Sequence, residues 1–159
     1  MTTTHFIDRV LRDLPLYTTC IPSNHISSIT TEVKADKLKP PFYFIVNTAP
    51  AHIEIGGHWM LVYCKRTEVE LFDSLALSRD LLPTDIIHFL NFYKKVVYSH
   101  KPIQSPSSIY CGLFAIGRAL SISNGQTLET FHSHFLTRDL DKNDLLVEDY
   151  IVRTLHEVY

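Results

Sequence analysis

The sequence is short of several features that would mark a specialised class of protein. Its 159 residues contain no apolar run of the roughly 18 residues that a membrane helix needs. The chain also lacks an opening basic segment followed by an apolar one, so we expect neither a secretory signal nor a membrane anchor. No internal repeat and no low-complexity tract is present.

Cysteine and net charge are also low. Three cysteines are an odd number at no repeating spacing, which argues against a disulfide framework and indicates a reducing compartment. Fifteen basic and seventeen acidic side chains give a formal charge of −2. This balance argues against a strongly basic footprint over the whole molecule, and a nucleic-acid partner is not indicated. Lys34, Lys37 and Lys39 do cluster, but we interpret them as a solvated loop rather than a binding patch.

What is present indicates an ordinary globular protein. The hydrophobic content is 45% and the charged content 20%, and we expect one domain over residues 1–159. Apolar spacing predicts strands over 42–47, 58–64 and 68–73. Helical spacing is expected over 4–13, 84–98, 111–121 and 127–135, and in a last helix that starts at 143 or 144 and reaches Leu155. The fold class is therefore α+β, with a small central mixed or antiparallel sheet and flanking helices.

Cys111 begins a segment that is apolar almost all round. At the start of a helix, a thiol feels the positive end of the helix dipole, which favours the thiolate. Gly112 would leave room for a substrate backbone to approach. Taken alone, a cysteine on an apolar helix is more often a core residue. Cys111 becomes a candidate nucleophile only together with other groups.

His58 and Asp73 lie at the outer ends of the two strands expected to pair through a turn at 65–67. Antiparallel strands joined by a tight turn bring their outer ends together, so the two side chains should be neighbours. Asp73 could then accept the imidazole Nδ1–H and orient the ring toward a thiolate. A lone histidine is more often a surface or hydrogen-bonded residue, and Asp73-Ser74 also resembles an ordinary turn.

Gln104 lies on the loop before Cys111, between Pro102 and Pro106. Its amide could donate to the oxyanion of a tetrahedral intermediate, together with the backbone N–H of Cys111. For the remaining cysteines and for two histidines, we expect structural positions rather than catalytic ones. We expect Cys20 and Cys64 in the core. His132 and His134 form a His-x-His pair without a third ligand at zinc spacing, which predicts a helix surface and no metal site.

These residues carry a family resemblance. Residues 57–59, 71–74 and 104–114 together resemble the adenain-type cysteine proteases of adenoviruses and related viral and mobile elements. The order His, Asp, Gln, Cys is also that of the ubiquitin-like-protein proteases, which share the fold, and differs from papain-like enzymes. The acid segment is closer to the ubiquitin-like-protein proteases, and the Gln-to-Cys spacing to adenain. The chain is most similar to Polinton or adintovirus proteases, which combine both features.

The resemblance implies a thiol endopeptidase without a cofactor. The four catalytic residues that it implies are Cys111, His58, Asp73 and Gln104. Those implied to bind substrate are Gly57, Trp59 and Gly112. The implied substrates are capsid or other virion precursors cut after Gly-Gly or Gly-x-Gly sites, in the virion and the host nucleus or cytoplasm. The peptide and DNA activators of adenoviral members are not carried over, because no cysteine lies between Asp73 and Cys111 and the chain is slightly acidic.

Other functions stay open at this point. A deubiquitinase or a protease for SUMO-type modifiers would use the same chemistry on a folded modifier that ends in Gly-Gly. A binding module could keep the constellation without using it. An acetyltransferase of the bacterial effector type, which shares the fold, is a more distant alternative.

Overall fold

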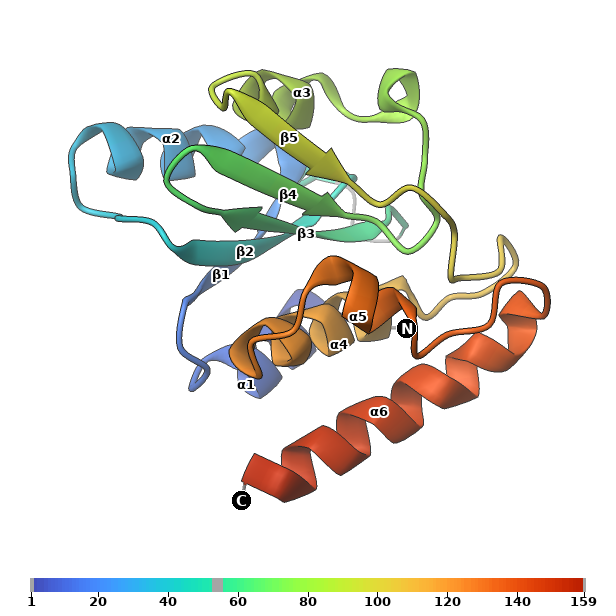
Figure 1. Cartoon of the computed structure of the whole chain (residues 1–159). Coiled ribbons are helices and arrows are strands. Elements are labelled where there is room, and N and C mark those ends of the chain that lie inside the picture. Colours follow the sequence, from blue (N-terminus) through green and yellow to red (C-terminus); the bar gives the residue numbers. More distant parts are fainter. Residues whose placement is uncertain (1, 53–55, 159) are drawn as a thin grey trace.

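One mixed five-stranded sheet organises the chain, and helices cover both of its faces (Figure 1). This computed structural model describes residues 2–52 and 56–158. The strands are β1 (Tyr17–Pro22), β2 (Phe42–Asn47), β3 (Trp59–Cys64), β4 (Glu68–Phe72) and β5 (Lys95–Tyr98). The α-helices are α1 (Thr4–Leu11), α2 (Ile26–Lys34), α3 (Thr84–Leu90), α4 (Cys111–Ser123), α5 (Leu128–His132) and α6 (Asn143–Val158). Short 3-10 turns cover Ser23–His25, Arg79–Leu81 and Leu140–Lys142.

The strands lie in the order β1-β2-β3-β4-β5. The three central strands are antiparallel to one another, and each edge strand runs parallel to its neighbour. Helices α2 and α3 lie on one face of the sheet, and α1, α4, α5 and α6 lie on the other (Figure 1). The α+β class and the small mixed sheet with flanking helices are confirmed.

The central strands are buried on both faces, which explains why their sequences read as nearly continuous apolar runs. In β2, Tyr43 and Ile45 pack toward α1 and α4. Phe44 and Val46, which alternate with them, pack toward α2 and α3. A strand covered on both sides needs apolar residues at every position rather than at every second one.

The expected helix over 84–98 is wrong in its second half. Helix α3 ends at Leu90, and β5 runs from Lys95 to Tyr98, parallel to β4. Backbone N–H groups of Phe92 and Tyr93 close tight turns that end the helix. The pair Val96-Val97 then extends the chain, because β-branched side chains pack well on a sheet.

The strand β1 and the helix α2 were not expected from the apolar spacing. β1 has the alternating, threonine-containing sequence of an edge strand, and only Cys20 among its residues is fully buried. Helix α2 is short and mostly polar, so its apolar stripe is narrow. Lys34 lies in its last turn, which makes the expectation of a solvated loop wrong for this residue. The expected core positions of Cys20 and Cys64 are confirmed.

A buried ion pair connects α4 with β4. The Arg118 guanidinium donates to both carboxylate oxygens of Glu70, with Nε–Oε1 and Nη2–Oε2 distances of 2.8 and 2.9 Å. Its Nη1 donates to the Ser121 hydroxyl and to the Gln126 carbonyl. Arg118 is 1% and Glu70 4% exposed. A charge can be this deeply buried because a bidentate partner and further acceptors satisfy the guanidinium.

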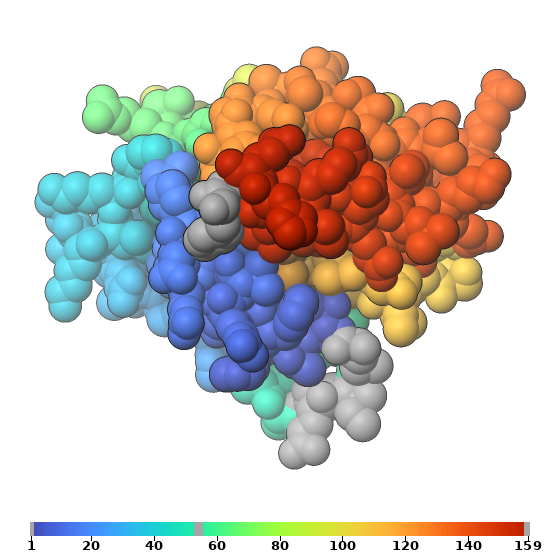
Figure 2. Space-filling model, turned by 90° about the horizontal axis from the view of Figure 1, so that it is seen from below, coloured from blue at the N-terminus to red at the C-terminus, as the bar shows by residue number. Residues whose placement is uncertain are grey.

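Helix α6 covers α4 on the side away from the sheet, and Figure 2 looks directly at that side. Because α4 lies between the sheet and α6, all of its residues from Phe114 to Ile122 are buried. Within residues 2–52 and 56–158, no helix combines the length and the hydropathy that crossing a membrane requires.

Candidate active site

Helix α4 places Cys111 at its first residue. The helix packs on β3, so its N-terminus lies next to the beginning of that strand. Backbone N–H groups in the first turn of a helix have no acceptor inside the helix. Cys111 is therefore held in the first turn of the helix, at the positive end of the helix dipole.

His58 immediately precedes β3 and is fixed through its backbone. Its N–H donates to the Thr48 hydroxyl at 2.8 Å, and its carbonyl accepts from the Thr48 N–H at 2.9 Å. Gly57, at a φ of +83°, leaves no space for a side chain, because a Cβ there would lie 2.0 Å from Asn47 Oδ1. The close approach of this glycine to β2 sets the direction in which His58 leaves the turn.

Asp73 directly follows β4 and is 3% exposed. Its Oδ1 lies 2.5 Å from His58 Nε2 and also accepts the Leu75 N–H, while Oδ2 accepts the Leu77 N–H. The Asp73 N–H donates to the hydroxyl of Ser99. The expected proximity of His58 and Asp73 is confirmed, but the expectation that Nδ1 faces Asp73 is wrong. The turn after Gly57 presents the ring with Nε2 toward β4, which leaves Nδ1 for the thiol.

The thiol of Cys111 lies near His58 and near the N–H groups of Trp59 and Gly112, which all favour the thiolate. Burial alone would raise the pKa of this thiol, but these contacts and the imidazolium charge outweigh it and lower the pKa below its usual value. Burial also opposes the charged form of His58. Hydrogen bonds to Asp73 and Cys111 and the charges of both outweigh this effect and raise the pKa of His58 to about 9. The arrangement favours a thiolate–imidazolium pair.

Gln104 lies in the same cleft, and its amide is oriented by the turn that follows Asp73. Its Oε1 accepts from the Ser74 hydroxyl at 2.5 Å, and its Nε2 donates to the Ser108 carbonyl at 2.9 Å. An amide nitrogen carries two hydrogens, so one remains for a substrate oxygen. Gln104 is 1% exposed. Such burial makes its orientation a property of the fold.

One cleft of about 620 Å³ is lined by the side chains of His58, Gln104 and Cys111, together with Gly57 and Trp59. Trp59 is 7% exposed, and its indole Nε1 donates to the carbonyl of Thr2 at 3.2 Å. Gly112 has a different setting from the one we expected. A Cβ on it would lie 2.5 Å from the Thr2 side chain, so Thr2 already fills the space that we had assigned to a substrate backbone. The expectation that Gly112 leaves room for a substrate backbone is therefore wrong.

Several residues that support the site carry no signal in the sequence. Ser74 orients Gln104, and Ser99 accepts from the backbone of Asp73. Asn143 is fully buried and donates to the Ile103 carbonyl, which attaches the start of α6 to the loop of Gln104. Each is an ordinary polar residue in a turn or at a helix end. Only the position of its partner, far away in the sequence, gives it a role.

His132 does not lie on a helix surface as expected. It is 1% exposed, packs against Phe72 and lies beside His100. Burial and the nearby positive charges lower the pKa of His132 to about 4. Among the residues that the structure describes, no three His, Cys, Asp or Glu side chains are grouped closely enough to hold a metal ion.

The sequence matches no model of a known protein family. No curated protein is significantly similar to it. Among solved structures, the ASFV pS273R protease aligns with a TM-score of 0.60 and 17% identity, over 96% of this chain and 65% of that chain. AvrA, in a structure with IP6 and CoA, aligns with a TM-score of 0.50 and 14% identity, over 95% and 66%. The SUMO protease Ulp1 aligns with a TM-score of 0.47 and 14% identity, over 96% and 76%.

This chain therefore spans less than two thirds of the length of the pS273R protease, and the likeness extends over nearly all of this chain. At 17% identity, the alignment shows a shared arrangement of helices and strands and nothing further. The chain has the fold of the ASFV pS273R cysteine protease, with a mixed five-stranded sheet between helices.

Proposed function

We propose that the protein is a cysteine endopeptidase in which Cys111 is the nucleophile, His58 the base, Asp73 the group that orients the base, and Gln104 an oxyanion donor. One observation carries the proposal. The buried Asp73 carboxylate lies 2.5 Å from Nε2 of His58, and the same ring contacts the thiol at the N-terminus of α4. Nucleophile, base and orienting acid are the three groups that thiol catalysis needs.

In the acylation step, the Cys111 thiolate attacks the carbonyl carbon of the scissile peptide. The carbonyl oxygen becomes an oxyanion that accepts from the free N–H of the Gln104 amide and from the backbone N–H of Cys111. The intermediate collapses as the C–N bond breaks. The leaving amine takes its proton from Nδ1 of His58, and a thioester remains on the sulfur.

In the deacylation step, His58 is neutral and its Nδ1 accepts a proton from water. The hydroxide adds to the thioester carbonyl, the C–S bond breaks, and the carboxylic acid leaves. Throughout both steps Asp73 accepts from Nε2–H. The two backbone N–H groups on its carboxylate, from Leu75 and Leu77, keep Asp73 in place while the ring changes charge.

The proposed substrates carry glycine before the cut, in Gly-Gly or Gly-x-Gly sites of viral or mobile-element precursors. The indole of Trp59 and the segment beginning at Thr2 flank the nucleophile, and such walls favour residues without side chains. The ASFV protease, with its similar fold, supports a viral setting. Folded modifiers that end in Gly-Gly are the alternative substrates.

The test uses a fluorogenic peptide ending in Leu-x-Gly-Gly, together with ubiquitin and SUMO reporters. We expect the wild type to release the fluorophore from the peptide, and Cys111→Ala and His58→Ala to lose this activity. If only the folded reporters are cleaved, the function is removal of modifiers and not processing of precursors. Acyl transfer from acetyl-CoA to an amine without peptide cleavage would indicate a transferase, an alternative suggested by the likeness to AvrA, whose structure contains CoA.

Alkylation provides a test that needs no substrate. Iodoacetamide at neutral pH should modify Cys111 and spare Cys20 and Cys64. These two thiols are buried, and burial raises the pKa of both. Mass spectrometry of the peptides identifies the modified sulfur. Equal, slow labelling of Cys111 in the wild type and in His58→Ala would contradict the ion pair and the proposed mechanism.

A further inference from the structure

A second groove lies at the other end of the sheet from Cys111. It holds about 320 Å³ between the end of α2, the turn after β3 and the segment after α3. Its apolar lining comes from Val33, Phe89, Phe92 and Tyr93. Phe92 is 62% exposed, so much of its ring faces solvent at the groove.

Four cationic side chains line the same groove, and no carboxylate does so within the part of the chain that the structure describes. These side chains are Lys34, Lys65, Arg66 and Lys94. Lys65 is already paired with Glu68, and Lys34 Nζ lies 5.1 Å from the centre of the Phe92 ring. In a chain with a net charge of −2, this concentration of positive charge around an apolar floor is a local feature.

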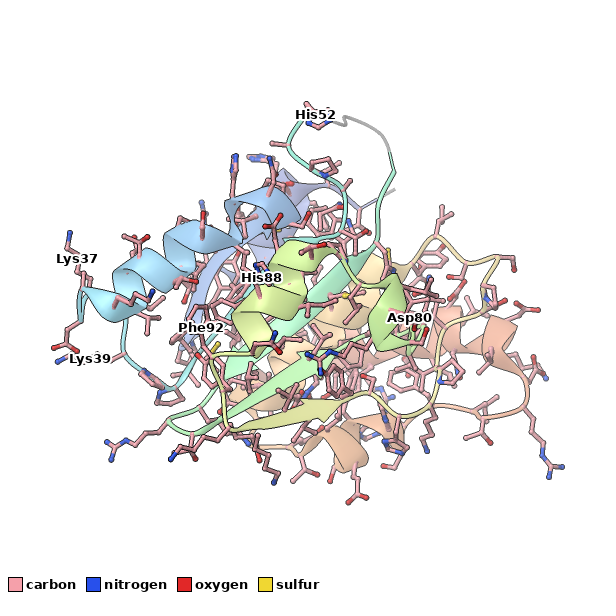
Figure 3. The ribbon with its side chains drawn as sticks, turned by 90° about the horizontal axis from the view of Figure 1, so that it is seen from above. Lys37, Lys39, His52, Asp80, His88 and Phe92 are labelled. Carbon is pink, nitrogen blue, oxygen red and sulfur yellow. The ribbon has the colours of Figure 1, made fainter. Side chains whose placement is uncertain are left out.

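The groove is separate from the candidate active site. His58 precedes the first residue of β3, and Lys65 follows its last residue. Six residues of extended chain place the two sites about 20 Å apart. Figure 3 shows this separation on the side of α2 and α3, where Phe92 and Lys37 lie well away from His52 on the loop beside the cleft.

We infer that this groove binds a peptide segment of a partner protein, in which an apolar or aromatic anchor is flanked by acidic residues. The apolar floor would bury the anchor, and Lys34, Arg66 and Lys94 would meet the carboxylates. A peptide fits better than a nucleic acid, because the groove combines its cations with an apolar lining of Val33, Phe89 and Tyr93, whereas nucleic-acid binding depends mainly on phosphate contacts. The inference concerns binding alone and does not rest on the catalytic proposal.

The experiment measures fluorescence anisotropy of a labelled peptide, Glu-Glu-Glu-Phe-Leu-Glu-Glu, added to the Cys111→Ala protein. We expect saturable binding that weakens as salt is added, since the contacts at the rim are exposed. The double variant Lys34→Glu/Arg66→Glu should weaken binding by about tenfold or more, because two attractions become repulsions. Phe92→Ala should weaken it with little change in the salt dependence.

The matched control is Lys37→Glu/Lys39→Glu. It changes the net charge by the same amount at the nearby end of α2, and neither residue lines the groove. Circular dichroism verifies that every variant is folded. Equal losses in the two double variants would overturn the inference, because general charge would then explain binding. Equal binding of a peptide with Gln in place of Glu would also overturn it, as would binding of oligo-dT without binding of the peptide.

Discussion

The hydroxyl of Ser74 donates to Oε1 of Gln104 at 2.5 Å, across thirty positions of sequence. The Ser74 carbonyl also accepts the backbone N–H groups of Ile103 and Gln104. Ser74, which follows Asp73, therefore holds the loop that carries Gln104, the proposed oxyanion donor. Asp73 and Gln104 are both supported by the turn at Ser74. A substitution of Ser74 should therefore change the rate of the proposed reaction, although Ser74 does not contact the substrate.

We expect Ser74→Ala to lower kcat by roughly ten- to hundredfold while KM changes little, because the Gln104 amide loses its fixed orientation. Gln104→Ala should lower kcat by about 10²- to 10³-fold. Steady-state kinetics on the glycine-containing peptide measures both. Ser74→Thr, which keeps the hydroxyl, should restore most of the activity. Ser107→Ala is the control, since that hydroxyl contacts Ser105 on the same loop and not Gln104. A parallel fall of kcat in this control would contradict the assignment.

The pH dependence of kcat/KM should have two limbs. The rate should rise as pH rises through the lowered pKa of Cys111, because the thiolate forms there. It should fall as pH rises through about 9, where the His58 imidazolium loses its proton. Asp73→Asn removes the carboxylate that helps to keep this pKa high, so the falling limb should move to lower pH. A falling limb that stays in place in Asp73→Asn would refute the pairing of His58 with Asp73.

Two adjacent glycines allow a matched comparison. Both have positive φ angles, +110° for Gly56 and +83° for Gly57. A Cβ on Gly56 would meet nothing within 4 Å, whereas one on Gly57 would lie 2.0 Å from Asn47 Oδ1. Gly56→Ala should therefore cost only the backbone strain of about 1–2 kcal/mol. Gly57→Ala should also displace His58 and abolish most activity. Thermal unfolding and kinetics of both variants provide the test, and equal behaviour would contradict the role of the clash.

The ion pair between Arg118 and Glu70 leads to a prediction about stability. Removing one partner leaves a buried charge without compensation, so Arg118→Met or Glu70→Leu alone should lower the free energy of unfolding by about 3–5 kcal/mol. The double variant should be markedly less destabilised than the sum of the two single changes. Denaturant unfolding followed by circular dichroism measures all three. Additive losses would show that the two residues do not act as a pair.

Much of the architecture could be predicted from the sequence, because it follows from apolar spacing. The buried strands β2 and β3 and the apolar helix α4 are long and unbroken, so tertiary contacts do not change their type. The apolar spacing over 84–98 wrongly predicted a single helix. Seven helical residues and four strand residues lie so close together that one helical stripe fits both. The edge strand β1 and the polar α2 have too little apolar pattern to be recognised.

In the candidate site, too, some features could be predicted from the sequence and others could not. His58, Asp73, Gln104 and Cys111 could be named because each residue type has a chemical reason to be there, and hairpin geometry brings the first two together. The ring nitrogen that faces Asp73 depends on a side-chain rotation that no spacing encodes. The filling of the space above Gly112 by Thr2 depends on how the chain start packs against α4, which is a long-range contact. The expectations about the ring nitrogen of His58 and about the space at Gly112 were therefore wrong.

The Arg118–Glu70 pair has a consequence for alignment as well as for stability. Arg118 lies two turns along the helix that begins with Cys111, and Glu70 lies on the strand that ends just before Asp73. Apolar side chains can slide past one another at small cost, but a bidentate ion pair tolerates little displacement. The pair therefore prevents α4 from translating along β4. Cys111 and Asp73, the proposed nucleophile and orienting acid, belong to separate segments of backbone, and this contact in the core connects the two segments.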